Sequence, residues 1–216
     1  MNTETMTVHK ALSELKVLDA RIRKETRGLS FAVANKHGNL KISGVPVAEY
    51  IERSKAKYKS VRTLINRRNT IKQALTNSNA ETKVTIDDRE YSVAEAIDMK
   101  NFGVTYLRDV LNIMETQYSF AKNAADLENG EKLDRRADAH VQAMYEGADM
   151  KNMSEEVRKT RENFIQSQTV EVVTPIPVEE EMTKLRDYID RFSVNVDSAL
   201  SVSNALTTIT VEYEVV

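Results

Sequence analysis

The sequence predicts a mainly α-helical protein of long antiparallel helices, a helical bundle or coiled coil, with small β-hairpins and a C-terminal β-strand. Charged residues make up 30% of the 216 residues and aromatic residues only 6%, which is typical of long helices with solvated faces and aliphatic seams. Apolar residues recur at three- and four-residue steps over long stretches. Short segments of alternating or turn-rich composition separate those stretches.

The first helix is expected between Thr7 and Gly28. The Thr7 hydroxyl can cap the free amides of the first turn, and apolar residues follow at helical spacing up to the glycine. Residues 31–42 then indicate a short β-hairpin, because two apolar runs flank a turn composition that contains Gly38.

A second helix is predicted from Pro46, where a proline is tolerated in the first turn, to residues 77–80, Asn-Ser-Asn-Ala, which are expected to end it. Residues 83–91 alternate around Asp87 and Asp88 and predict a second hairpin with an aspartate turn.

The third helix has a predicted start at Ser92, where Ser92 and Glu95 form a capping box. An apolar seam with a period of seven follows it: Ile97, Val104, Leu111, Tyr118 and Ala125. From Lys122 the chain becomes polar and charge-mixed as far as Ser167, which favours an inserted helical arm.

The C-terminal part is predicted to contain a strand, the longest seam and a final strand. Residues 169–174 are β-prone and end at prolines. Apolar residues from Val178 to Leu206 alternate steps of four and three, which is coiled-coil spacing. Residues 208–216 alternate strictly and are expected to pair with residues 169–174, with a hairpin or with a neighbouring subunit.

These elements suggest three segments. Residues 1–121 form a helical core with two short hairpins, residues 122–167 form the polar helical arm, and residues 168–216 complete the core. The net charge of −2 conceals an uneven distribution, since residues 53–72 contain eight bases and no acid while residues 171–216 are acidic. The basic segment therefore has either an internal acidic partner in the C-terminal helix or an external polyanion.

Nothing in the sequence indicates catalysis or a cofactor. The chain has no cysteine, its three histidines lie in different predicted elements, and no glycine-rich phosphate loop or nucleophile motif is present. We therefore expect no catalytic, cofactor-binding or metal-binding residues. The polar first residues and the lack of a long apolar run favour a protein that is not directed to secretion and does not enter a membrane.

Several stretches carry a family resemblance. They are the helix Val8 to Ile22, the sequence Ile65-Asn-Arg-Arg-Asn69, the segment Thr85 to Ala96, the start Val173 to Val178 and the end Asn204 to Thr208. In this order they resemble a bacterial and phage family of helical proteins often labelled septicolysin-like. The resemblance implies a helical, self-associating protein without established enzymatic activity.

Our leading hypothesis is a non-enzymatic structural or assembly protein, an oligomeric phage virion component or similar scaffold, in the cytoplasm or on the particle. Its expected partners are further copies of itself and other structural proteins. The alternatives are a protein that binds nucleic acid or another anionic ligand through the basic helix, and an enzyme whose site forms between subunits. The interaction candidates are Lys55, Lys59, Arg62, Arg67 and Arg68 on the basic helix, and Leu185, Ile189, Phe192, Val196, Val211 and Tyr213 in the C-terminal segment.

Overall fold

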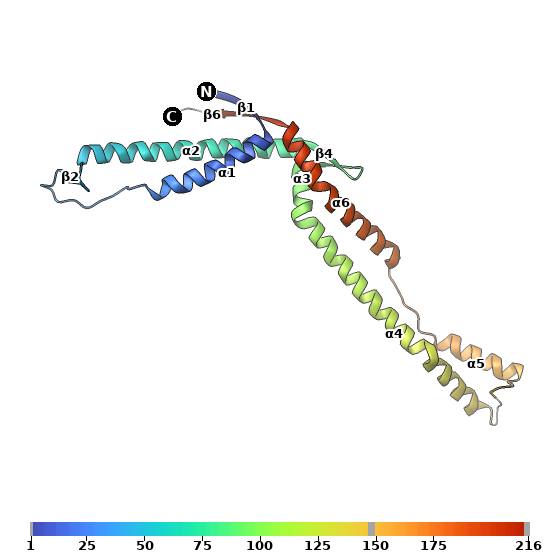
Figure 1. Cartoon of the computed structure of the whole chain (residues 1–216). Helices are drawn as coiled ribbons and strands as arrows, with labels where there is room; N and C mark the ends of the chain where they lie inside the picture. Colours follow the sequence, from blue (N-terminus) through green and yellow to red (C-terminus); the bar gives the residue numbers. More distant parts are fainter. Residues whose placement is uncertain (1, 147–149, 214–216) are drawn as a thin grey trace. The chain divides into compact units, whose positions relative to one another are not determined.

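The computed structural model describes residues 2–146 and 150–213, and helices hold most of them (Figure 1). The predicted mainly α-helical class with small antiparallel strand pairs is confirmed. The chain divides into two compact units, one formed by Met1–Phe102 with Arg191–Val216 and the other by Gly103–Asp190. Within the described ranges, no helix combines the length and apolarity needed to cross a membrane.

A two-stranded antiparallel sheet brings the two ends of the chain together in the first unit (Figure 1). β1 (Asn2–Thr7) pairs with β6 (Thr208–Tyr213), with Met6 opposite Ile209. The alternation predicted for the last strand is confirmed in its described part, because Ile209 and Val211 are buried between exposed neighbours. The partners predicted for this strand, which were residues 169–174, a hairpin or a neighbouring subunit, were wrong, because β6 pairs with β1. Val215, in the same predicted strand, lies outside the described residues.

The core of the first unit lies where this sheet covers α1 (Val8–Arg27) and α2 (Val47–Glu81). Its buried members are Met6, Val8, Ala11, Leu15, Leu18, Ile71, Leu75, Ile209 and Val211. The predicted start of α1 is confirmed, since the Thr7 side chain accepts a hydrogen bond from the Lys10 amide at 3.2 Å. Gly28 caps its end by donating its amide to the Glu25 carbonyl at 3.1 Å.

The hairpin predicted over residues 31–42 is wrong in its position between α1 and α2. Residues 31–40 contain no strand, and β2 (Lys41–Ile42) pairs instead with β3 (Val45–Pro46). The turn between them has positive φ at Ser43 and Gly44, a conformation that glycine adopts at little cost, so Gly44 and not Gly38 determines the hairpin.

The α2 helix also continues through residues 77–80 to Glu81, where we predicted a break. Asn, Ser and Ala cost at most about 0.7 kcal/mol each in a helix interior, which the adjoining buried turns at Ile71 and Leu75 offset.

The second predicted hairpin and the capping box are confirmed. β4 (Lys83–Ile86) pairs with β5 (Arg89–Ser92), and Asp87 and Asp88 both have positive φ, as a two-residue type I′ turn requires. Ser92 donates its amide to the Glu95 carboxylate at 2.7 Å and its hydroxyl accepts the Glu95 amide at 3.1 Å. This box starts α3 (Val93–Asp98), which passes into the π-helical turn η1 (Met99–Gly103).

The second unit is built on α4 (Val104–Met144), whose helical path is interrupted at Gly130. Beyond Gly130, α4 pairs with α5 (Glu155–Gln168). The buried side chains of this helical hairpin are Leu133, Ala137, Val141 and Val157. The boundaries of the two units differ from the three segments predicted from the sequence, because α4 extends from the third core helix across the interruption at Gly130 into the first half of the arm.

The last helix, α6 (Val178–Leu206), has the predicted extent and contributes to both units. The strand predicted over residues 169–174 is absent from this described segment. The Asn129 side chain instead donates to the Val170 carbonyl at 2.8 Å and accepts the Val170 amide at 2.7 Å. One side-chain amide thus satisfies backbone groups that a neighbouring strand would otherwise bond.

Candidate functional site

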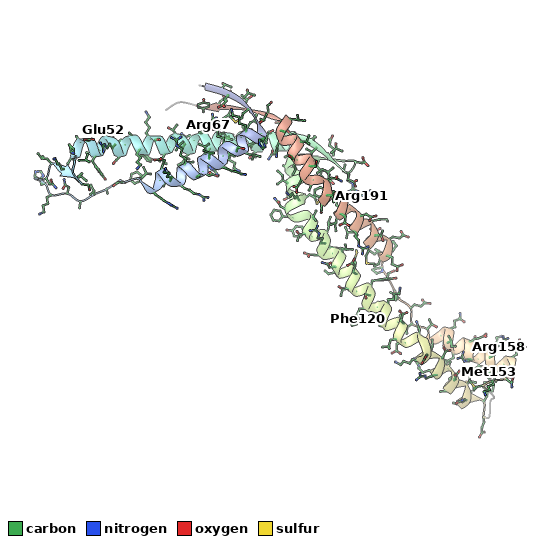
Figure 2. All side chains as sticks on the ribbon, viewed as in Figure 1. Glu52, Arg67, Phe120, Met153, Arg158 and Arg191 are labelled. Carbon is green, nitrogen blue, oxygen red and sulfur yellow. The ribbon has the colours of Figure 1, made fainter. Side chains whose placement is uncertain are left out.

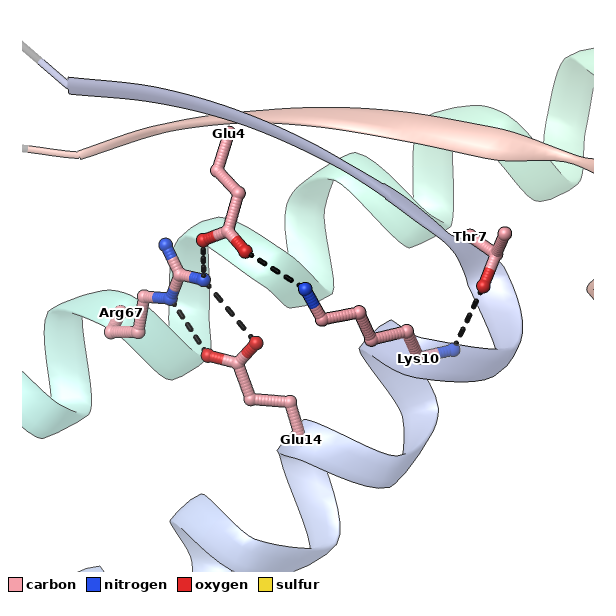
Figure 3. A network of polar contacts seen from close by, with 5 residues as sticks. All are labelled: Glu4, Thr7, Lys10, Glu14 and Arg67. Atoms are coloured by element: carbon pink, nitrogen blue, oxygen red, sulfur yellow. Dashed lines mark hydrogen bonds and ion pairs between the residues drawn. The ribbon is translucent and has the colours of Figure 1, made fainter.

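Arg67 is the most extensively bonded of the predicted basic residues (Figure 3). Its Nε donates to Glu14 at 2.8 Å, and its Nη2 donates to Glu4 at 2.6 Å and to Glu14 at 3.2 Å. Lys10 donates to the other oxygen of Glu4 at 3.2 Å. The Arg67 Cζ also lies 4.4 Å from the ring centre of Tyr213. Arg67 therefore connects α2 with β1, α1 and β6 inside the first unit.

These contacts shift the pKa values of the ion pair in opposite directions. Hydrogen bonds to Glu14, and then to Glu4, raise the pKa of Arg67 against the opposing effect of burial. The hydrogen bond from Arg67, followed by the one from Lys10, lowers the pKa of Glu4. Both groups are therefore charged at neutral pH, and Arg67 binds acidic partners in its own chain.

The other basic candidates lie along the same helix. Arg68 forms an ion pair with Asp19 at 2.6 Å and Lys55 forms one with Glu52 at 3.0 Å, while Arg62 lies over the ring of Tyr58 at 5.9 Å. Lys59 is exposed. The acids that pair with this helix thus come from β1, α1 and α2 itself, and not from the acidic C-terminal helix that the sequence suggested as an internal partner.

The first half of α2 borders an open groove of about 520 Å³. Phe31 and Tyr58 line it with their rings edge to face, 5.6 Å between centres, and Lys55 adds a cationic group. Aromatic rings beside cations can stack on bases and attract phosphates, which keeps nucleic-acid binding as the second candidate function.

The predicted apolar interaction residues of the C-terminal segment are covered by their own chain. Ile189, Phe192, Val196 and Val211 are buried, and Leu185 and Tyr213 are half-buried. Because these side chains already pack within the molecule, the α6 seam leaves little surface for a second copy. Self-association through that seam, which we expected, has no support in this packing.

The predicted seam of α4 is likewise turned inward within the second unit. Leu111 and Ala125 are buried. On the same side of the helix, Tyr118 donates its hydroxyl to Glu179 of α6 at 2.6 Å, which raises the pKa of Tyr118. Arg186 of α6 forms an ion pair with Glu115 of α4. The first part of α6 therefore runs along this face of α4.

A different apolar face of α4 is exposed, and it was not identified from the sequence. The exposed fractions of its large side chains are Tyr106 64%, Val110 45%, Ile113 56%, Phe120 78% and Leu127 73%. Gln117 and Ala124, also exposed, fill the remaining positions of the same series. We call these seven residues the outer face of α4; Phe120 is labelled in Figure 2.

The outer face has a signature in the sequence. Tyr106, Ile113, Phe120 and Leu127 are spaced by seven, and each lies two positions after a residue of the inward seam. Two residues correspond to roughly 200° around a helix, so the two series occupy different sides of α4. The α4 helix therefore has apolar residues on two sides, and its own chain covers only the inward one.

A pocket of about 410 Å³ lies beside the outer face within the second unit. Met114, Gln117 and Ala121 of α4 line one side, and residues 172–176 line the other. Val173 is almost fully exposed at its rim, so it extends the apolar surface next to Gln117.

Two aspartates and one histidine of the polar arm have partners within the second unit. Asp134 and Asp138 both accept hydrogen bonds from Arg161 of α5 at 2.7 Å, and His140 stacks on Phe164 with 4.5 Å between ring centres. Among residues 2–146 and 150–213 no cluster of three His, Asp or Glu side chains is placed to hold a metal ion. Comparison of the chain with protein-family models, with curated proteins and with solved structures finds no match.

Proposed function

We propose that this chain is a non-enzymatic structural protein that assembles into homo-oligomers through the outer face of α4. The observation that carries the proposal is the exposure of Tyr106, Val110, Ile113, Phe120 and Leu127 on one side of a long helix. Soluble proteins rarely leave a continuous apolar patch of several hundred Å² uncovered unless it serves as an interaction site.

The size of the face agrees with a protein interface. The exposed fractions of its five large residues add up to about three fully exposed side chains. At about 150–250 Å² for a large side chain, this corresponds to roughly 500 Å² of apolar surface per copy. Met114, Ala121 and Val173 widen it toward the roughly 800 Å² per partner of a standard interface. Membership of a phage particle or similar scaffold, in the cytoplasm or on the particle, and contact with other structural proteins are finer parts of the proposal; they rest on the family resemblance alone.

The test compares two charge insertions at exposed apolar positions. Phe120→Glu places a carboxylate in the outer face, whereas Val194→Glu makes a similar change at a 76% exposed residue of α6 outside that face. We expect Phe120→Glu to weaken association by at least about 100-fold, equivalent to about 2.8 kcal/mol. Val194→Glu should leave the oligomer mass, measured by light scattering, the same as that of the native chain. Equal masses for both variants and the native chain would exclude the outer face as the interface.

Nucleic-acid binding is the second candidate, favoured by the groove beside Tyr58 and Lys55. A salt titration against duplex DNA of random sequence separates it from assembly. Because Arg67 and Arg68 are paired with acids of their own chain, we expect no retention of DNA even at low salt. Binding that weakens steeply as salt rises would establish the second candidate.

A further inference from the structure

We infer that the outer face of α4 pairs with the same face of a second copy in antiparallel orientation, with the twofold axis crossing this face between Ile113 and Gln117. This inference rests on the proposed function and specifies the partner and its direction. It is carried by the order of large and small residues along the face.

The outer face has the spacing of a coiled-coil seam. Tyr106, Val110, Ile113, Gln117, Phe120, Ala124 and Leu127 alternate steps of four and three, and Gly103 precedes Tyr106 by three. Two helices joined along such a seam meet in layers, one residue from each helix in each layer. The residues that share a layer depend on whether the helices run parallel or antiparallel.

In the antiparallel arrangement, residues equally distant from Glu115 share a layer. Tyr106 then meets Ala124, Phe120 meets Val110, and Leu127 meets Gly103. Each aromatic ring therefore faces a smaller side chain, and no layer holds two aromatic rings or two small residues.

A parallel arrangement would place each residue against its own copy. Two Tyr106 rings and two Phe120 rings would crowd their layers, while two Ala124 residues would leave a gap. Both overfilled and empty layers are destabilising, by about 1–3 kcal/mol for the overfilled ones.

The flanking residues fit the antiparallel arrangement as well. Between Tyr106 and Ala124, the positions next to the seam are apolar or uncharged except for Asp109. Asp109 would lie beside Asn123 of the second copy and not beside a second carboxylate, so no like charges meet. Gln117 would face Ile113 in the central layers, where one polar residue favours a single register at some cost in stability.

Cross-linking between engineered cysteines tests this arrangement, because the native chain contains no cysteine. Asp109→Cys and Asn123→Cys change flanking positions and leave the seam intact. Differently tagged copies of the two variants are co-expressed and oxidised, and we expect a disulfide between the variants. Each variant alone should cross-link no more than the exposed control Val194→Cys, since like positions would be roughly 18 Å or more apart along the axis at 1.5 Å per residue.

Ala124→Cys provides the opposing test. In a parallel pair the two introduced thiols would meet in one layer, whereas in the antiparallel pair they would be roughly 27 Å apart along the axis. Efficient self-cross-linking of Ala124→Cys, without cross-linking between Asp109→Cys and Asn123→Cys, would overturn the inference. An oligomeric native mass with no cross-link in either test would overturn the antiparallel pairing and leave assembly standing, and a monomeric native mass would remove both.

Discussion

Replacing Arg67 by Met should lower the free energy of unfolding by about 2–3 kcal/mol at pH 7. Hydrogen bonds to charged groups contribute about 1.5–3 kcal/mol when partly buried, whereas exposed ion pairs contribute less than about 1 kcal/mol. The Arg67 side chain is 14% exposed and its partners Glu4 and Glu14 are 32% and 27% exposed, so the contact belongs to the partly buried class. The Met side chain keeps the aliphatic packing but leaves the two carboxylates without their shared cation.

Arg68→Met is the matched control, since it makes the same change at the next residue of α2. Arg68 has one carboxylate partner, Asp19, and both side chains are about one-third or more exposed. We expect this variant to lose less than about 1 kcal/mol.

The difference between Arg67→Met and the native chain should also depend on pH. Arg67 and Lys10 hold the pKa of Glu4 below its ordinary value of 4.5, so the resulting stabilisation is complete above pH 4.5 and is lost as pH falls through the lowered pKa. Without Arg67 most of that lowering disappears. The stability gap should therefore be largest at neutral pH and narrow below pH 4.5.

Urea unfolding followed by far-UV circular dichroism measures the global effect, and hydrogen exchange at the β1 and β6 amides measures it where the contact lies. Equal losses for Arg67→Met and Arg68→Met, or a gap that does not change between neutral and acidic pH, would refute this reasoning.

Three further outcomes are expected in the same stability assays. Val211→Ala should lower the free energy of unfolding by about 2 kcal/mol, because Val211 is fully buried in the core of the first unit. Val194→Ala should change it by no more than about 0.5 kcal/mol. Similar values for both variants would show that β6 does not pack as described. The φ angle of Asp88 is 61°, which glycine adopts at little cost and a β-branched residue does not. Asp88→Gly should therefore keep or raise stability, whereas Asp88→Val should lower it by about 1–3 kcal/mol. Equal stability of the two variants would contradict the turn geometry. Replacing residues 131–168 by a flexible linker should leave hydrogen-exchange protection in the first unit unchanged, since that unit contains none of them; lost protection of β1 and β6 would show that the arm supports it.

Elements with local signals were predictable from the sequence. The Thr7 cap, the Ser92 capping box, the Asp87 turn and the α6 seam each depend on residues a few positions apart, and all are present in the structure. Their physical causes, hydrogen bonds to free amides and burial of one helical stripe, act within a single element.

The pairing of β1 with β6 could not be predicted in the same way. β1 has one buried apolar side chain, Met6, so its alternation is weak, and its partner lies at the other end of the chain. Residues 169–174 show the opposite error: their strand-like composition lacks a strand partner, and Asn129 satisfies the backbone at Val170 instead. Pairing depends on tertiary context that a local pattern does not contain.

The interaction surface expected from the sequence and the one proposed from the structure lie on different helices for a related reason. The seams of α4 and α6 have the same kind of spacing, and the sequence does not specify which of them the chain covers with its own residues. Burial of Ile189, Phe192 and Val196 assigns the α6 seam to the fold, and exposure of Ile113 and Phe120 leaves the outer face of α4 uncovered.

The mass of the native chain in solution, measured by light scattering over a range of concentrations, tests the central proposal most directly. The account predicts a mass of at least twice 24.5 kDa at micromolar concentration, with a decrease toward the monomer on dilution. A mass of 24.5 kDa at every concentration would contradict it.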